Sequence, residues 1–221
     1  MIISFANQKG GVGKSTHCAL LAQYLCDKEK KVHVIDMDFQ MSLLNKRKND
    51  ESFSLSERRE QDEAVFDNSL NYSIEAITPV DIIDYLKKIN SDKESVYIID
   101  TPGSLSNENV VKTLYMSDFI IIPFDYSELK LDSTAVFIQF IKRFRITSKL
   151  IFLPNDLDKR YRENRPEALD KVNKIFSEHG VVAPIVYHLA DMKRFSTLEM
   201  SARQREIILP TYDFIYEYVF I

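Results

Sequence analysis

The segment Lys9-Gly10-Gly11-Val12-Gly13-Lys14-Ser15-Thr16 follows the short apolar run Ile2–Phe5 and precedes an apolar helical pattern. Its glycines let backbone N–H groups turn towards phosphate oxygens, while the second lysine and the serine hydroxyl can reach outer phosphates and a magnesium ion. A Gly-rich turn without a ligand is the alternative. Because strand, loop spacing and helix agree, we predict a phosphate-binding loop whose nucleotide-binding residues are Gly10, Gly11, Val12, Gly13, Lys14, Ser15 and Thr16.

Apolar runs and helical patterns alternate along the chain. The runs typical of buried parallel strands are Ile2–Phe5, Val32–Ile35, Val96–Ile99, Phe119–Ile122, Leu150–Leu153 and Val181–Val186, with Tyr72–Ile77 weaker. The helical patterns cover Ser15–Lys28, Val80–Ile89, Asn107–Met116, Ser127–Phe144, Arg165–His179 and about Pro210 to Tyr218. This alternation predicts a doubly wound α/β fold with a mostly parallel sheet and a ligand at the carboxyl ends of its strands.

The length and composition are those of one domain. The 221 residues are 45% hydrophobic, enough for one sizeable core over residues 1–221. The segment from about 45 to 71 is polar, and we interpret it as a mobile insertion or a short surface helix. The net charge of −4 argues against a protein that coats nucleic acid with its whole surface, although a local basic patch is possible.

Two cysteines, Cys18 and Cys26, lie eight residues apart on the first predicted helix. They indicate neither a disulfide framework nor a zinc site, and small buried thiols of this kind usually pack without reacting. The sequence shows no signal peptide before the first strand and no apolar run long enough for a membrane span. We therefore expect a cytoplasmic protein with no membrane partner.

Carboxylates follow two of the predicted strands. Asp36 and Asp38 come directly after the second strand, and Asp100 ends the run Val96–Ile99 before Thr101-Pro102-Gly103. A buried carboxylate at Asp100 needs a cation to offset its desolvation, so we predict that it coordinates magnesium through water, opposite Ser15. Solvated acids at strand ends and an ordinary turn are the alternatives.

Together these motifs resemble the ParA/MinD family of partition and positioning ATPases. The additional lysine, Lys9, carries the resemblance, because this family has a deviant phosphate loop with a lysine there. The resemblance implies ATP and Mg²⁺ as ligands, and a homodimer in which Lys9 reaches the partner's nucleotide. It also implies that Lys14 is catalytic, that Asp38 orients the attacking water, and that Asp36 contacts magnesium through water. Phe39 stands where the family has proline.

The adenine pocket is less strongly marked. Asn155 follows the run Leu150–Leu153, and in the family an asparagine at the corresponding strand end borders the base, which makes Asn155 our candidate for a base contact. Pro184 is a weaker candidate for the pocket wall. Ordinary turn chemistry, for which Pro154-Asn155-Asp156 is well suited, is the alternative.

Three outputs of such a switch are possible: DNA partition, membrane positioning and delivery of a metal or cluster. The segment Pro210–Ile221 has two acids and no basic residue, which disfavours binding to anionic lipid, and the missing Cys-x-x-Cys pair disfavours delivery. Basic clusters favour nonspecific double-stranded DNA, although solvated helix ends would look the same. The clusters are Lys142, Arg143 and Arg145; Lys159, Arg160, Arg162 and Arg165; Lys193 and Arg194; and Arg203 and Arg205.

The chain most resembles small, single-domain ParA proteins, because no helix-turn-helix module precedes the phosphate loop. This resemblance implies that the ATP-bound dimer binds nonspecific DNA near the nucleoid, and that a ParB-like partner stimulates hydrolysis to segregate plasmid, chromosomal or mobile-element DNA. A MinD-like positioning ATPase and a nucleotide-dependent adaptor for a protein client are the alternatives.

Overall fold

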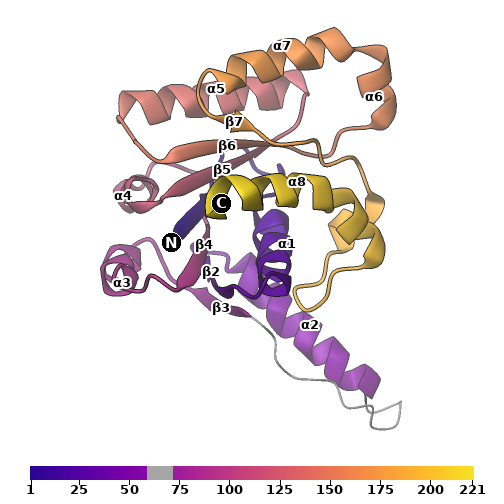
Figure 1. Ribbon diagram of the computed structural model, residues 1–221. Helices are drawn as coiled ribbons and strands as arrows, with labels where there is room; N and C mark the ends of the chain where they lie inside the picture. Colours follow the sequence, from indigo (N-terminus) through magenta and orange to yellow (C-terminus); the bar gives the residue numbers. More distant parts are fainter. Residues whose placement is uncertain (59–71) are drawn as a thin grey trace.

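The computed structural model describes residues 1–58 and 72–221, with the backbone alone for 55–58. Its strands are β1 (Ile2–Phe5), β2 (Lys31–Asp36), β3 (Tyr72–Ala76), β4 (Ser95–Asp100), β5 (Phe119–Phe124), β6 (Lys149–Pro154) and β7 (Val181–Val182). They form one sheet in the order β3-β2-β4-β1-β5-β6-β7, and each neighbouring pair is parallel (Figure 1). The predicted doubly wound α/β fold is therefore confirmed.

The helices lie on both faces of this sheet. They are α1 (Lys14–Asp27), α2 (Ser42–Arg58), α3 (Ile82–Ile89), α4 (Glu108–Met116), α5 (Glu128–Arg143), α6 (Lys159–Asn164), α7 (Pro166–Ser177) and α8 (Ala202–Phe220), with the 3₁₀ helix η1 at Ala190–Arg194. Within the described ranges, no helix is both long and apolar enough to cross a bilayer.

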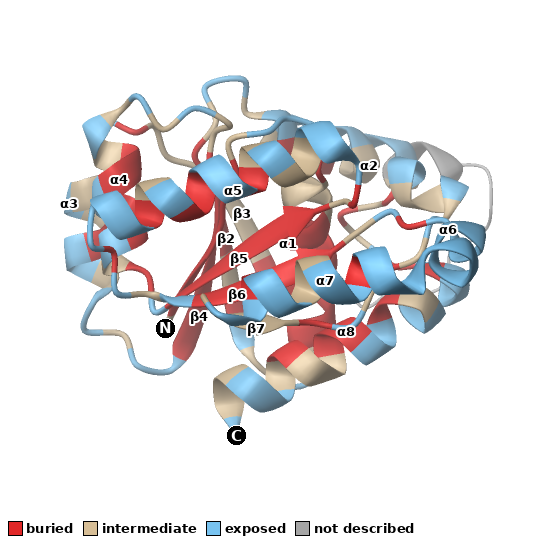
Figure 2. Ribbon diagram, turned by 90° about the horizontal axis from the view of Figure 1, so that it is seen from above, coloured by how far each residue is buried: buried red, intermediate tan, exposed pale blue. Residues whose placement is uncertain are grey.

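Alternation along the strands divides the core into two layers, because successive side chains in a strand point to opposite faces. In β1, Ile3 and Phe5 pack in one cluster with Leu21 of α1 and Tyr212 of α8. Ile2, their neighbour, packs in another cluster on the side of α3 and α4. The sheet is therefore buried on both faces, as Figure 2 shows for its central strands, and this explains why the strands are continuous apolar runs.

The polar segment that we interpreted as an insertion contains a regular element. Helix α2 begins at Ser42 and continues to Arg58, so it is longer than a short surface helix and follows β2 as the next helix of the fold. Its side towards the sheet buries Leu43 and also Arg47, which is only 5% exposed. The charged residue concealed the buried face from sequence analysis. The remainder of the interpretation, residues 59–71, lies outside the described part of the chain.

Two other boundaries differ from the prediction. Helix α8 begins at Ala202 rather than near Pro210, because Ser201 forms a capping box with Gln204 and the helix continues through the proline. The strand predicted over Val181–Val186 is regular only at Val181–Val182.

Candidate nucleotide site at the carboxyl edge of the sheet

The phosphate loop connects β1 to α1. Gly11 and Gly13 have φ angles of 71° and 99°, in the left-handed region that favours glycine. The loop ends where α1 begins, at Lys14, so the free N–H groups of the first helical turn point towards the loop. A helix N-terminus of this kind favours an anion such as phosphate.

Asn7 holds the start of the loop. Its Nδ2 donates to the carbonyl oxygen of Pro123 at 2.9 Å and to Oγ1 of Thr134 at 3.1 Å. Its Oδ1 accepts the backbone N–H of Lys9 at 3.2 Å. The backbone of Lys9 is therefore fixed, while the residue itself is exposed.

The side chain of Lys14 turns back towards the phosphate loop. Its Nζ is 3.4 Å from the carbonyl oxygen of Lys9, and it lies 3.9 Å from the position that a Cβ on Gly103 would occupy. The ammonium group therefore lies between the phosphate loop and the segment after β4, where a bound phosphate would meet both.

Asp100 is brought next to the loop by strand register. Phe5 and Asp36 are its partners on the two neighbouring strands, so the two carboxylates end adjacent strands. Asp100 is 3% exposed, and in the described structure its Oδ1 has no hydrogen-bond partner. Burial raises the pKa of Asp100 to about 7, a shift that a hydrogen bond with Ser15 opposes and the nearby charge of Asp36 reinforces.

This donor set fits a magnesium ion. A buried carboxylate oxygen without a partner, close to a serine hydroxyl and a phosphate-binding loop, is the environment that a hard divalent cation stabilises. No group of three or more His, Cys, Asp or Glu side chains suited to holding a metal exists among residues 1–58 and 72–221. Phosphate and water would therefore have to supply the remaining ligands, as is common for magnesium.

Asp36 makes contacts that the sequence did not predict. Its Oδ2 accepts the backbone N–H groups of Leu43 at 2.9 Å and Leu44 at 3.1 Å, at the beginning of α2. Its Oδ1 accepts the N–H of Asp38 at 3.1 Å. Burial raises the pKa of Asp36, although these three bonds oppose the shift. Asp36 therefore caps α2 and orients the turn that carries Asp38.

Asp38 lies on the loop between β2 and α2 and is partly exposed. Its Oδ1 accepts the backbone N–H of Gln40 at 3.0 Å, and its backbone carbonyl oxygen accepts the backbone N–H of Met41. Phe39, in the same loop, is 64% exposed. The loop thus presents a carboxylate and an exposed aromatic ring just after the carboxyl end of β2.

A pocket continues from the phosphate loop towards the end of β6. Asn155 lies in it, and its Nδ2 donates to the carbonyl oxygen of Val12 at 3.0 Å. A Cβ on Gly13 would lie only 2.6 Å from this Nδ2, so the amide fills the space that the glycine leaves. Asn155 supports the loop in this way, and its role towards a base stays a prediction.

The other walls of the pocket come from segments that sequence analysis did not identify. Tyr187, Leu189, Met192 and Lys193 line one side, and Asp125 and Lys130 line another. Pro184 is not among the lining residues; its carbonyl oxygen accepts the hydroxyl of Thr211 at 2.9 Å. No motif marks the 187–193 segment, because only the topology brings it to the phosphate loop.

Lys130 and Asp125 form an ion pair at the pocket. Burial alone would raise the pKa of Asp125, but contacts with Lys130 and Ser127 outweigh it and lower this pKa. The pair gives the pocket a polar wall.

His17 lies beneath the loop, fully buried in the first turns of α1. Its Nδ1 and the hydroxyl oxygen of Tyr212 are 2.7 Å apart. Within the described residues its Nε2 has no hydrogen-bond partner, although Asn155 is near enough to favour the protonated ring slightly. Burial dominates and lowers the pKa of His17 to about 4. The imidazole is therefore neutral at physiological pH.

The cysteines of α1 pack in the core. Cys18 is fully buried, and burial raises its pKa well above the usual range of a thiol. Burial also raises the pKa of Cys26 to about 11. Both thiols stay protonated at neutral pH, which agrees with a packing role.

Comparison with known proteins supports the same assignment. A family model described as the CobQ/CobB/MinD/ParA nucleotide binding domain matches residues 3–202. The chain belongs to this family. The ParA and MinD members of this family are P-loop ATPases, and the match confirms the resemblance seen in the motifs. No curated protein sequence matches the chain.

Solved structures of this family share the fold. A plasmid partition protein of Borrelia burgdorferi bound to AMPPNP is 20% identical, with a TM-score of 0.71 over 99% of this chain and 98% of that chain. MinD of Aquifex aeolicus is 16% identical, with a TM-score of 0.73 over 98% and 97%. McdA of Cyanothece in complex with ATP is 16% identical, with a TM-score of 0.69 over 100% and 96%. At these identities the comparison establishes the fold.

Proposed function

We propose that the protein is a Mg²⁺-dependent partition ATPase, which dimerises with ATP and binds nonspecific double-stranded DNA in that form. One observation carries the proposal: the exposed Lys9 and the inward Lys14 share one phosphate loop, and the buried Oδ1 of Asp100 has no hydrogen-bond partner among residues 1–58 and 72–221. Lys14 can serve the nucleotide of its own subunit. Lys9 is free to reach across a dimer interface.

Different residues of the site would have different roles in ATP hydrolysis. Backbone N–H groups of the loop and Lys14 bind the phosphates, and Asp38 holds the attacking water in line. Asp100 and Ser15 would hold Mg²⁺, and Asp36 would contact the ion through a water molecule. When bound, the ion would neutralise negative charge on the phosphates. Lys9 would stabilise the charge that develops on the partner's nucleotide.

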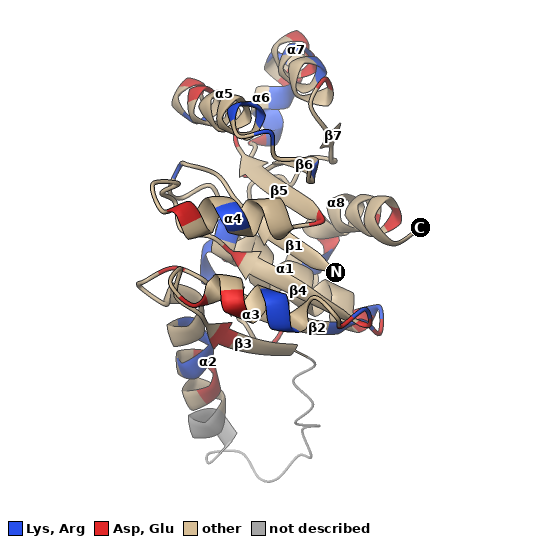
Figure 3. Ribbon diagram, turned by 90° about the vertical axis from the view of Figure 1, so that its left-hand side faces the viewer, with Lys and Arg blue, Asp and Glu red and all other residues tan. Residues whose placement is uncertain are grey.

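Basic residues beside the pocket support a DNA partner. Figure 3 shows Lys and Arg (blue) on α6, which carries Lys159, Arg160 and Arg162. Tyr187, which lines the pocket, accepts a hydrogen bond from Arg162, and its ring centroid is 5.5 Å from Nζ of Lys159. A nucleotide in the pocket would therefore contact the same tyrosine that holds the α6 side chains available to DNA phosphates.

The late basic clusters are not equally available for DNA. Arg205 forms an ion pair with Asp27 of α1. Nζ of Lys142 lies 3.4 Å from Nε2 of His179. We therefore favour α6, whose Lys159 and Arg162 contact the pocket residue Tyr187, together with Lys193 of the same pocket, as the site for DNA phosphates.

Binding to random-sequence duplex DNA tests the proposal. We expect binding with ATP that weakens steeply as salt increases, and weaker binding with ADP or without nucleotide. Lys14→Ala should abolish the response to ATP, and Asp38→Ala should retain the dimer because hydrolysis stops. Binding to anionic liposomes but not to DNA would instead favour a positioning ATPase.

The role of Lys9 needs its own measurement. Lys9→Ala should retain ATP binding and lose ATP-dependent dimerisation in analytical ultracentrifugation. Dimerisation that persists in this variant would contradict a role in the partner's site.

A further inference from the structure

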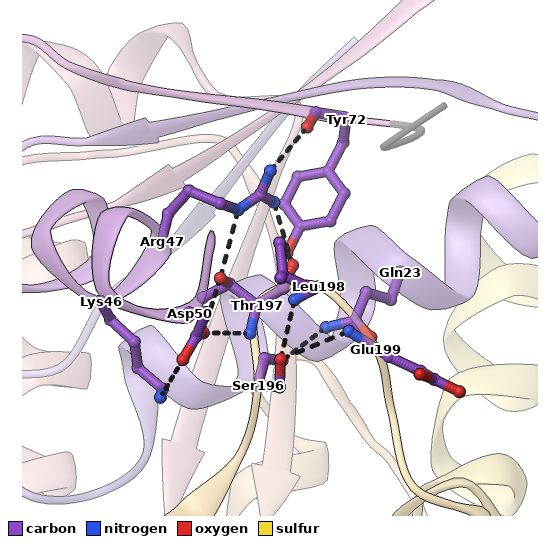
Figure 4. Close-up of polar contacts among 9 residues, drawn as sticks. All are labelled: Gln23, Lys46, Arg47, Asp50, Tyr72, Ser196, Thr197, Leu198 and Glu199. Carbon is purple, nitrogen blue, oxygen red and sulfur yellow. Dashed lines mark hydrogen bonds and ion pairs between the residues drawn. The ribbon is translucent and has the colours of Figure 1, made fainter. Parts of the chain in front are cut away.

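A polar cluster joins α2 to the loop at residues 195–199, which precedes α8 (Figure 4). Arg47 of α2 donates from Nε to Oγ1 of Thr197 at 3.2 Å and from Nη2 to the carbonyl oxygen of Thr197 at 3.0 Å. Oδ2 of Asp50 accepts the N–H of Thr197 at 2.7 Å and its hydroxyl at 2.8 Å. Tyr72 donates its hydroxyl to the same carbonyl at 2.6 Å. We call these four residues the Thr197 clasp.

The clasp uses all the polar groups of one threonine. The backbone N–H, the carbonyl oxygen and the hydroxyl of Thr197 are each bonded to a side chain from another element. Arg47 is 5% exposed and lies 4.4 Å from the ring centroid of Tyr72. Nη1 of Arg47 forms an ion pair with Oε1 of Glu51 at 3.9 Å. Such a buried charge is costly, and this arrangement fixes one geometry more than it adds stability.

One end of the clasp leads to the carboxylates after β2. Asp36 accepts the first N–H groups of α2, and Leu43 in the same turn is buried. Arg47 follows one turn later on the same helix. A displacement of Asp36 would therefore move α2 and with it the guanidinium of Arg47.

The other end leads to the pocket wall. Met192 and Lys193 of η1 line the pocket, only a few residues before Thr197. Two further side chains hold this segment: Gln204 donates to the carbonyl oxygen of Asp191 at 2.8 Å, and Gln23 donates to that of Ser196 at 2.9 Å. The wall is therefore fixed to its surroundings on both sides of Phe195.

We propose that the Thr197 clasp couples the carboxylates at the end of β2 to the η1 wall of the nucleotide pocket. Arg47 and Thr197 act as positioning residues, since neither lines the pocket. A phosphate group bound near Asp36 would set the position of α2. The clasp would then transmit this change of position to η1, the wall of the pocket that contacts the nucleoside. The inference rests on the proposed function only in requiring that the pocket takes a nucleotide.

Because such coupling is reciprocal, it has a signature in binding. Inorganic tripolyphosphate occupies the phosphate end alone, whereas ATP occupies both ends. Loss of the clasp should therefore weaken ATP and leave tripolyphosphate unchanged. A purely structural role would lower the melting temperature without changing the ratio of the two affinities.

Calorimetric titration of the full chain with Mg-ATP and Mg-tripolyphosphate tests the inference. Thr197→Val removes the hydroxyl at similar volume, and we expect its ATP affinity to fall by about two- to thirty-fold with that for tripolyphosphate unchanged. Thr211→Val is the matched control, because Thr211 is also fully buried and makes one side-chain bond, to Pro184.

Two results would overturn the inference: an unchanged ratio of affinities in Thr197→Val, which includes an equal loss for both ligands, or the same change of the ratio in Thr211→Val. If Thr197→Val does not fold, Arg47→Lys keeps the charge but loses the guanidinium geometry, and the same shift in the ratio is expected. A wild-type chain that binds neither ligand would refute the proposed function itself, and the coupling with it.

Discussion

The side-chain amide of Asn155 donates to the carbonyl oxygen of Val12 at 3.0 Å, so the end of β6 supports the phosphate loop from the side. This bond joins two segments that are distant in sequence. It also explains why the loop has no room for a larger residue at its last glycine.

Gly13→Ala should therefore destabilise the protein. The new Cβ would lie 2.6 Å from Nδ2 of Asn155, and the φ of 99° is unfavourable for any residue with a side chain. We expect a loss of about 1–3 kcal/mol in the free energy of unfolding, measured by urea denaturation without nucleotide. Gly10→Ala is the control, because its Cβ would meet no atom within 4 Å. Equal stability of the two variants would contradict this account.

His17 predicts how stability depends on pH. Burial lowers its pKa from 6.5 to about 4, so the unfolded chain takes up a proton at a higher pH than the folded chain. Stability contributed by the neutral ring is complete above pH ~6.5 and is lost as the pH falls towards 4, by up to about 3 kcal/mol. Urea denaturation at pH 7 and pH 5 should show the loss, and His17→Gln should reduce it. The same pH dependence in His17→Gln would assign the loss to other groups.

Asp100→Ala should reduce the effect of magnesium on ATP binding. Without the buried carboxylate, the site loses the group that offsets the charge of Mg²⁺, and the affinity of the protein for Mg²⁺ should fall by about 10- to 100-fold. Titration with fluorescent ATP analogues, with Mg²⁺ and with EDTA, measures the change. EDTA should weaken ATP binding in the wild type and have little further effect in the variant; an unchanged response to EDTA would exclude Asp100 from the metal site.

Tyr187→Phe should separate DNA binding from nucleotide binding. The ring stays in the pocket, so ATP affinity should be retained, but Arg162 loses the hydroxyl that holds it. We expect a smaller difference in DNA affinity between the ATP and ADP forms, measured by fluorescence anisotropy. Tyr126→Phe, which removes a hydroxyl bonded to Asn173 at 2.7 Å, is the control. If both variants behave as the wild type, Tyr187 does not connect the two sites.

Much of the fold could be predicted because both faces of the sheet are buried. Such strands are short continuous apolar runs, and each predicted run contains a strand in the structure. The length and buried face of helix α2 were not predicted, for the opposite reason: one of its buried side chains is Arg47, which the apolar pattern counts as exposed. Pro210 concealed the first half of α8, because a proline usually marks the beginning of a helix rather than its interior.

Some parts of the candidate site could likewise be predicted from the sequence and others could not. The phosphate loop and Asp100 are marked by local sequence, since glycines and a strand-ending acid have a fixed spacing. Met192 and Tyr187 are not, because they reach the pocket through chain crossings with no local signal. The capping of α2 by Asp36 was also hidden, since a carboxylate after a strand is equally compatible with metal, water or a helix N-terminus.

The order of the strands also has a consequence for folding. Strand β1 lies between β4 and β5, and its register pairs Ile3 with Ile98 on one side and with Phe119 on the other. The phosphate loop follows β1 directly, yet the two neighbours of β1 are β4 at residues 95–100 and β5 at residues 119–124, so this strand obtains both partners only after β5 has been synthesised. Contacts of such high sequence separation form slowly. Nascent chains on the ribosome should therefore acquire affinity for nucleotide late and abruptly, when the centre of the sheet closes.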